Sequence, residues 1–441
     1  MKTKRSHAVA AELISFSLPL VLSGVLQQLY SWADAFIIGH AEGEMQLAAI
    51  GATTSLSSFL NNTILGVTLG LSIMAAQHFG RGNTDQIRKT LSSFFPLLCG
   101  LYALLASGAL FFLEPVLHLM DTPIEIFADA LSYLRILLLG VPFLACYNLY
   151  AALLRAAGDT KAAFYAVVVS SLSNVILDIL LVVILPMGVT GAAIATAASQ
   201  MGMTVFIALF ARKKHPDLFR LAGKPRMDAA VISEGIRFSA PPAIKNSITS
   251  FGHLALQSFM NSFGAATVLA VTTAYRVDCI TLLPIINLGA AISIMTARAK
   301  GAQDDAKIRA CLTTGMLLML FISAALASAM YLFGGAFIAL FGVTGGALAE
   351  GRVFFQDLSI FYPIFGAGIV LQSVLEGEGD ISFCSMVGIG TLLLRIALSY
   401  LLRPVFAERT IALAEGFTWV VMPMIFVCRM YLRAHRRRAS A

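Results

Sequence analysis

Polar and acidic side chains recur at helical spacing inside two strongly apolar stretches of the chain. The two sets are Ser23, Gln27, Ser31 and Asp34 within residues 13–38, and Ser170, Asn174 and Asp178 within residues 161–186. Steps of three and four residues place each set on one face of a helix. With Thr196, in a third apolar stretch, they supply two carboxylates, an amide oxygen and a hydroxyl. Such hard oxygen ligands suit a Na⁺ site or a carboxylate pair that shares a proton.

An ionisable side chain at membrane depth costs about 2.5–3.5 kcal/mol on insertion scales, so Asp34 and Asp178 predict a functional site. Two carboxylates that face one cavity repel each other, and one of them then takes up a proton readily. The alternative is that each aspartate pairs with a basic residue. Within the first six apolar stretches only Arg135 lies at depth, near the start of the fourth, which favours ion coupling.

The composition is that of a membrane protein. Of 441 residues, 58% are hydrophobic and 12% are charged, and the mean hydropathy is +0.82. This excludes a soluble enzyme and a disordered chain, in which charged residues are far more abundant. A membrane-spanning helix needs about 20 mostly apolar residues. Twelve stretches qualify, at residues 13–38, 47–78, 91–113, 131–156, 161–186, 189–211, 231–261, 267–296, 308–333, 351–375, 381–404 and 410–432.

The basic residues follow an alternating pattern. Lys and Arg number 23 in the amino-terminal segment, in every second loop and in the carboxyl-terminal tail, and only Arg352, Arg403 and Arg409 lie in the other loops. Cytoplasmic loops of membrane proteins carry this excess. We therefore predict that both termini lie in the cytoplasm of a multi-pass protein of the cytoplasmic (inner) membrane. The net charge of +7 then reports topology, and no nucleic-acid partner is expected.

The second half of the chain repeats the first. Phe16-Ser17-Leu18-Pro19 recurs as Phe238-Ser239-Ala240-Pro241, Ser72-Ile73-Met74 as Ser293-Ile294-Met295, and Gly158-Asp159 as Gly379-Asp380. The offsets are 222, 221 and 221 residues. We predict an all-α membrane protein with twelve transmembrane helices in two six-helix bundles, related by a pseudo-two-fold axis along the membrane normal. The expected parts are an amino-terminal lobe (1–211), a basic cytoplasmic linker (212–230) and a carboxyl-terminal lobe with a basic tail (231–441).

Repeat-built membrane proteins of this size are mostly secondary transporters, with the substrate site between or within the halves. No G-x-x-x-x-G-K-[ST] motif is present, so an ion gradient is the expected energy source. Gly377-Glu378-Gly379-Asp380 resembles the motif of intramembrane aspartyl proteases. Asp380, however, falls in a predicted cytoplasmic turn, as does its repeat partner Asp159, and we therefore expect no enzyme.

The carboxyl-terminal half carries different charges. Lys245, Arg276, Asp278 and Arg395 lie in its apolar stretches, and Asn246, Thr249, His253 and Gln257 form a polar stripe. One interpretation is internal pairing, for example of Lys245 or Arg276 with Asp278. The other is that Lys245 or Arg395 meets an anionic part of a substrate. His253 is expected to line a cavity, because no second metal ligand accompanies it.

The chain resembles the multidrug and toxic compound extrusion (MATE) family. The resemblance is carried by Pro19 and Asp34 in the first stretch, Asn174-x-x-x-Asp178, Thr196 and the doubled bundle. It implies that Asp34, Asn174, Asp178 and Thr196 bind H⁺ or Na⁺, and that the first helix bends at a hinge near Pro19. One branch of the family has carboxylates on the seventh and tenth spans. This chain has no match for them, since Phe365 stands near the tenth-span position.

The resulting hypothesis is an antiporter that exports amphipathic organic cations or drugs in exchange for H⁺ or Na⁺, by alternating access of two lobes. It needs no cofactor beyond the coupling ion, functions as a monomer in the lipid bilayer and binds a small-molecule substrate. The rival hypothesis is a lipid or lipid-linked saccharide flippase of the same superfamily. The predicted substrate-cavity residues are Gln27, Ser31, Tyr147, Asn148, His253, Gln257, Lys245 and Arg395.

Overall fold

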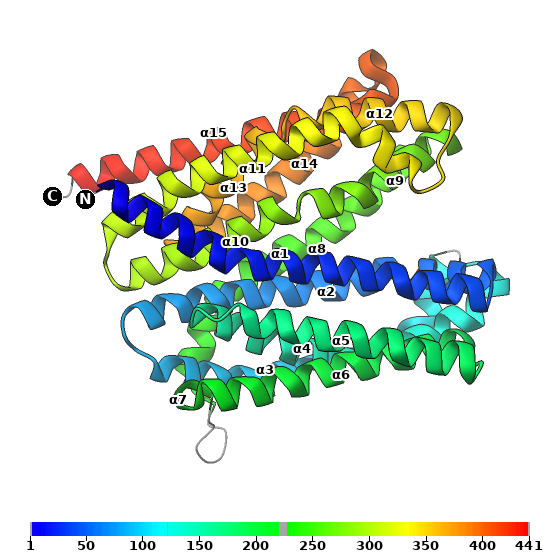
Figure 1. Ribbon diagram of the computed structural model, residues 1–441, viewed down its shortest axis with the longest axis horizontal. Helices are drawn as coiled ribbons and strands as arrows, with labels where there is room; N and C mark the ends of the chain where they lie inside the picture. The colour runs from blue at the N-terminus through cyan, green and yellow to red at the C-terminus, as the bar shows by residue number, and fades with distance from the viewer. Residues whose placement is uncertain (1, 121, 220–226, 440–441) are drawn as a thin grey trace. The chain divides into compact units, whose positions relative to one another are not determined.

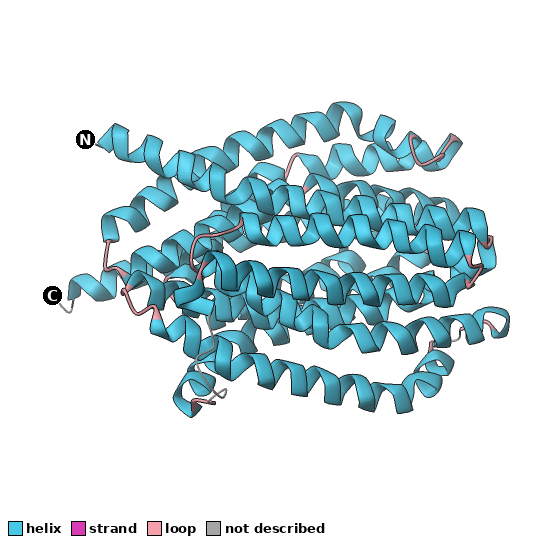
Figure 2. Cartoon of the chain, turned by 60° about the horizontal axis from the view of Figure 1, so that its bottom comes forward, coloured by secondary structure: helices cyan, strands magenta, loops and turns pink. Residues whose placement is uncertain are grey.

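The computed structural model describes residues 2–120, 122–219 and 227–439, with side chains from His7 to His435 within those ranges. Every regular element in these ranges is a helix (Figure 2), which confirms the all-α class. Residues 220–226 of the predicted linker lie outside the described residues, as do the side chains of Lys2, Lys4 and Arg5.

The helices follow one another with short connections (Figure 1). In the first half they are α1 (Lys2–Ala41), α2 (Glu44–Gly80), α3 (Asp85–Leu119), α4 (Ile124–Ala156), α5 (Lys161–Asp178), the π-helix η1 (Ile179–Ile184), α6 (Gly188–Lys214) and α7 (Pro216–Phe219). In the second half they are α8 (Ala229–Asn261), α9 (Ala265–Thr281), α10 (Leu283–Gly301), α11 (Asp305–Ala339), α12 (Gly345–Ser359), α13 (Tyr362–Gly377), α14 (Ile381–Phe406), the 3₁₀ turn η2 (Ala407–Arg409) and α15 (Thr410–Ala439).

Each of the twelve predicted stretches coincides with one helix or one pair of consecutive helices. Eight helical stretches of the described chain are long and apolar enough to cross a membrane, or ten if each bent pair counts as one span. The count is below twelve for two reasons. Polar side chains interrupt α8, which does not qualify, and α14 and α15 are counted together as Ile381–His435.

Two spans of the second half are broken. The axes of α9 and α10 differ by 41°, and those of α12 and α13 by 48°. Pro284 and Pro363 stand in the first turn of α10 and α13. A proline there lacks the N–H that would continue the hydrogen bonds of the preceding helix, so each span restarts in a new direction.

The chain divides into two compact units. The first, called here the amino-terminal unit, is Pro19–Ala243, and the carboxyl-terminal unit is Met1–Leu18 together with Ile244–Ala441. The divisions fall inside α1 and α8, in both cases beside the repeated Phe-Ser-x-Pro motif. Contact density thus groups the start of α1 with the second half of the chain, whereas the predicted lobes were drawn at the linker.

A central helix organises each unit. In the amino-terminal unit α4 packs against α2, α3 and α6. Its inner half, from Ala145 to Leu154, is entirely buried. In the carboxyl-terminal unit α13 packs against α10, α11 and α15. At the repeat offset of 221 residues, α4 corresponds to the broken pair α12–α13 and α2 corresponds to α9–α10.

Candidate functional site

The amino-terminal unit brings the two predicted aspartates together. Asp34 on α1 is half-buried, while Asp178 at the end of α5 is 0% exposed and Asn174, one turn earlier, is 1% exposed. The carboxyl groups of Asp34 and Asp178 interact directly. The helical spacing therefore correctly predicted that the acidic faces of these two helices meet.

The polar atoms at this position have few protein partners. Within the described residues, Asp34 Oδ1, both carboxylate oxygens of Asp178, both amide atoms of Asn174 and Ser171 Oγ are buried without a hydrogen-bond partner. Buried polar atoms without partners are costly, because they have lost water and gained nothing in exchange. A proton or a small cation would satisfy the oxygens, so the donor set fits such an ion.

Tyrosines complete the surroundings of the acidic pair. Tyr133 on α4 is 6% exposed; its phenol contacts the Thr196 hydroxyl and interacts with both carboxylates. Tyr30 on α1 interacts with Asp34, one turn away. The sequence analysis placed Thr196 here but missed both tyrosines. The only available signal was a polar group within an apolar stretch, which Tyr shares with many buried packing residues.

The backbone is irregular beside Asp178. The α-helix α5 ends at this residue and continues as the π-helix η1, Ile179–Ile184. Segments of π-helix are rare and concentrate at functional sites, because the wider turn changes the direction of the side chains around it. Here the change of helix type follows the carboxylate that belongs to the acidic pair.

The alternative of separate basic partners is not what the described residues show. The basic residue considered for that role, Arg135, donates through Nη2 to Glu114 Oε1 at 2.9 Å, and both side chains are about half exposed. No ion pair joins a Lys or Arg to Asp34 or Asp178 in the described part of the chain. The pair is therefore a concentration of negative charge without a compensating cation.

The substrate-cavity candidates of the amino-terminal unit lie in different environments. Gln27 and Ser31 on α1 are exposed. Tyr147 and Asn148 on α4 are each 6% exposed, and the Asn148 amide donates to the Leu144 carbonyl of its own helix at 2.9 Å. The α1 residues are accessible, whereas Tyr147 and Asn148 are mostly packed.

The candidates of the carboxyl-terminal unit are likewise divided. His253 on α8 is exposed, and the Gln257 amide donates to Asn261 at 3.0 Å. Lys245 lies near Glu376 of α13, and its aliphatic stem lies against Gly388. Arg395 donates to Glu415 Oε2 at 2.7 Å with both side chains largely buried.

The suggested pairing of Lys245 or Arg276 with Asp278 does not occur among the described ion pairs. Arg276 is exposed, and Asp278 instead accepts a hydrogen bond from the Tyr362 hydroxyl. Residues only two positions apart point in different directions around a helix, which separates Arg276 from Asp278.

The repeated Gly-Asp turns are structural clamps. Gly158 and Gly379 have φ values of 95° and 97°, a left-handed conformation that favours glycine. The aspartates that follow bind the last helix of each half. Asp159 Oδ2 lies 2.7 Å from Lys214 Nζ and 3.0 Å from His215 Nε2, and Asp380 Oδ2 lies 2.9 Å from Arg429 Nε.

Asp159 is buried, and burial raises the pKa of a carboxyl group. The hydrogen bonds from Lys214, His215 and the Ala162 amide outweigh this effect and lower the pKa of Asp159. Asp380 is bound by two arginines, Arg429 and Arg433. A catalytic role for the Gly-x-Gly-Asp motif is therefore unsupported.

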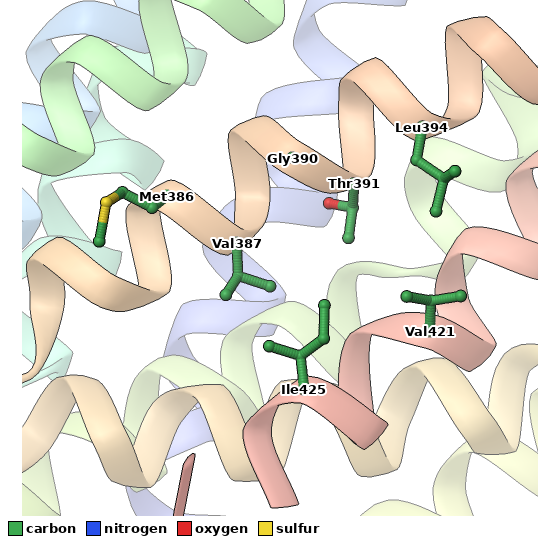
Figure 3. A pocket seen from close by; sticks show the side chains of 7 residues that line it. All are labelled: Met386, Val387, Gly390, Thr391, Leu394, Val421 and Ile425. Atoms are coloured by element: carbon green, nitrogen blue, oxygen red, sulfur yellow. The ribbon is translucent and has the colours of Figure 1, made fainter. Parts of the chain in front are cut away.

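A hollow of about 330 Å³ lies between α14 and α15 (Figure 3). Its lining residues are Met386, Val387, Gly390, Thr391, Leu394, Val421 and Ile425. Thr391, which bears the only side-chain oxygen among these lining residues, donates it to the Gly388 carbonyl of its own helix. This hollow offers no group that could hold a cation and is separate from the acidic pair.

Comparison with known proteins identifies the family. The model of the MatE family matches residues 19–180 and matches again over residues 241–401. The chain belongs to the MATE family. The two matches begin 222 residues apart, which confirms the repeat found in the sequence.

Relatives and structures agree with this assignment. The probable multidrug resistance protein YoeA of Bacillus subtilis is 27% identical over 88% of this chain and 85% of its own length. An outward-facing structure of a multidrug resistance MATE transporter of the MOP superfamily superposes with a TM-score of 0.90 at 20% identity, covering 97% of both chains. A MOP transporter from Pyrococcus furiosus, described as having a binding pocket of reverse polarity and a different function, has a TM-score of 0.88 at 20% identity. It covers 96% of this chain and 95% of its own.

The MATE assignment settles the broad class. This protein is a multi-pass membrane transporter and not an enzyme. Multidrug relatives imply small molecules as substrates.

Proposed function

We propose that this MATE protein is a secondary antiporter that exports amphipathic organic cations in exchange for H⁺ or Na⁺. The observation that carries the proposal is the acidic pair of Asp34 and Asp178, buried together without a basic partner and surrounded by unsatisfied polar atoms. A site with surplus negative charge binds a cation, and a gradient of that cation can drive transport.

In this proposal the coupling ion occupies Asp34, Asn174, Asp178 and Thr196. Binding from outside neutralises the pair and weakens the attraction of the same unit for a cationic solute, which is then released. Coupling requires this difference in affinity between the two states, because a ligand with equal affinity for both shifts no equilibrium. Pro19, at the division of α1 between the two units, is the proposed hinge.

The topology is part of the proposal. Both termini lie in the cytoplasm of an inner-membrane protein, because the loops on that side hold 23 of the 31 Lys and Arg residues. The protein acts as a monomer, since twelve spans suffice to enclose a pathway. The substrate passes the polar residues Gln27 and Ser31, which are accessible on α1.

The flippase hypothesis requires a basic group free to meet a phosphate. Arg395 is paired with Glu415, and Lys245 lies near the carboxylate of Glu376. The basic side chains that favoured a phosphate-bearing substrate thus have acidic neighbours in their own unit, and we retain the antiporter as the conclusion.

The test is transport by purified protein in liposomes under an imposed H⁺ or Na⁺ gradient, with an ethidium-like cation as the probe. Asp34→Asn and Asp178→Asn each remove one charge of the pair, and we expect gradient-driven efflux to fall to the level of empty liposomes. Asp357→Asn is the control, because that carboxylate is held by Arg409.

The choice between ions is tested with Asn174→Leu. If Na⁺ is the coupling ion, loss of the amide oxygen should abolish Na⁺-driven efflux, whereas a shared proton needs only the two carboxylates and proton-driven efflux should persist. Undiminished gradient-driven efflux by Asp34→Asn would contradict the proposed function.

A further inference from the structure

A second buried group of ionisable side chains lies in the carboxyl-terminal unit, on four different helices. Its members are Tyr275 and Asp278 on α9, Tyr362 at the start of α13, Arg395 on α14 and Glu415 on α15. Asp278 is 4% exposed and Glu415 is 8% exposed. None of these residues belongs to the acidic pair of the amino-terminal unit.

Hydrogen bonds divide the group into two parts. Arg395 Nη2 donates to Glu415 Oε2 at 2.7 Å and to the Tyr275 hydroxyl at 2.6 Å, and Tyr275 donates to the same glutamate oxygen at 3.2 Å. Asp278 stands apart from this triad and accepts from the Tyr362 hydroxyl. One guanidinium therefore faces two carboxylates and compensates only one of them.

The neighbouring elements supply no further positive charge for Asp278. The ionisable groups that act on it are Tyr362, Glu415 and Arg395, and His253 of α8 lies near Arg395. Arg276 and Cys279, beside it on α9, are exposed, and on α12 Arg352 is exposed while Asp357 is bound by Arg409. The charged residues of α10 and α11 are confined to one end of each helix: Arg298, Lys300, Asp305, Lys307 and Arg309.

The backbone marks the same place. Asp278 lies one turn before the break between α9 and α10, and Tyr362 is the first residue after the break between α12 and α13. The hydrogen bond between them thus connects the two interrupted spans. Interrupted membrane helices recur in transporters at the positions where coupling ions bind, because unwound backbone and polar side chains are tolerated only there.

We propose that Asp278 is a proton-binding site of the carboxyl-terminal unit, occupied while Arg395 is paired with Glu415. An isolated carboxylate in this position would be buried without compensation, whereas a protonated one is neutral. Tyr362 can serve both states, since its hydroxyl donates to an ionised carboxylate and either donates to or accepts from a protonated one. Movement of Arg395 from Glu415 toward Asp278 would expel the proton from Asp278 and return one to Glu415.

Infrared spectroscopy of the purified full-length protein in detergent tests this site without a transport assay. A protonated carboxylic acid has a carbonyl stretching band that an ionised carboxylate lacks. The background is the double variant Asp34→Asn/Asp178→Asn, which removes the amino-terminal pair. We expect this background to retain a protonated-carboxyl band at neutral pH that disappears when Asp278→Asn is added. An identical spectrum with and without Asp278→Asn would overturn the proposal.

Two further variants in the same background test the charge balance. Glu415→Gln leaves Asp278 as the remaining carboxylate for Arg395, so the Asp278 band should be lost although Asp278 is intact. Tyr362→Phe removes the hydroxyl partner, so the band should persist at a shifted frequency. A band that survives Glu415→Gln unchanged would refute the assignment to Asp278. Asp357→Asn, which alters a carboxylate paired with Arg409, is the control and should leave the band as it is.

The two proposals fail independently. The band measures protonation of the carboxyl-terminal unit, whereas efflux by Asp34→Asn measures coupling at the amino-terminal pair.

Discussion

The two units share a repeated helical plan and differ in how they treat buried charge. In the amino-terminal unit two carboxylates meet without a basic partner. In the carboxyl-terminal unit Arg395 compensates Glu415, and Asp278 remains beside Tyr362. Each unit also has its irregular backbone beside its acidic residues, as the π-helix after Asp178 and as the two broken spans that Asp278 and Tyr362 adjoin.

The comparison teaches that duplication preserved the backbone plan and left the chemistry free to diverge. At the repeat offsets, Asp34 corresponds to Leu256 and Asp178 to Ser399. Hydrophobic packing demands only an apolar surface of the right length, so many sequences fit a span. A buried charge, in contrast, requires particular partners, and each unit has solved that requirement separately.

The largest expected effect on stability breaks the carboxyl-terminal network. Asp278→Asn together with Glu415→Gln leaves the Arg395 guanidinium buried without a carboxylate, and we expect a loss of about 3–5 kcal/mol in the free energy of unfolding. Thermal or denaturant unfolding in detergent measures it. The matched double variant Asp34→Asn/Asp178→Asn removes two uncompensated charges and should cost nothing. Equal losses in both doubles would show that the units do not differ in this way.

A smaller effect concerns the central helices. Gly377 of α13 lies so close to α10 that an added Cβ would stand 2.6 Å from the Ser293 carbonyl oxygen, whereas the corresponding residue of α4 is Ala156. We expect Gly377→Ala to cost about 1–3 kcal/mol, as overpacking does. Gly390→Ala, where a Cβ meets nothing within 4 Å, is the control for unfolding measurements. If Gly377→Ala unfolds like the wild type, the closer approach of α13 to α10 has no energetic weight.

The smallest expected effect concerns the clamps, in which the units are alike. Lys214, opposite Asp159, is about half exposed, so Asp159→Asn should cost only about 1 kcal/mol at neutral pH. The pKa of Asp159 is lowered in the folded protein. Its contribution is therefore complete above the unfolded-state pKa of about 4 and is lost as the pH falls further.

Unfolding of wild type and Asp159→Asn between about pH 3 and pH 7 checks this sign. The difference between them should shrink on acidification. Asp380→Asn tests the equivalent clamp, where two arginines replace Lys214 and His215. A difference that grows with acidity would contradict the assignment at Asp159.

Much of the fold could be read from local patterns. All twelve apolar stretches became helices or consecutive helix pairs, because the length and hydropathy of a segment determine whether it can cross a membrane. The repeat was visible in short motifs at one offset. The meeting of Asp34 with Asp178 followed from two polar faces that could be satisfied only by turning inward.

Other features depend on how helices are rotated and displaced against one another. Arg395 and Glu415 lie on different helices, and no local pattern indicated that Arg395 would select Glu415, or that Asp278 would bind Tyr362 and not a nearby lysine or arginine. Tyr133 likewise joins the acidic pair from a separate helix.

The sequence by itself thus determined which segments are helical and apolar, their order, the repeat and the acidic character of one face on α1 and α5. Tertiary structure decided which charges are compensated and where the spans break. The physical reason is range: hydropathy and helical periodicity act over a few residues of one segment, whereas an ion pair at membrane depth depends on the distance between atoms of helices far apart in the chain.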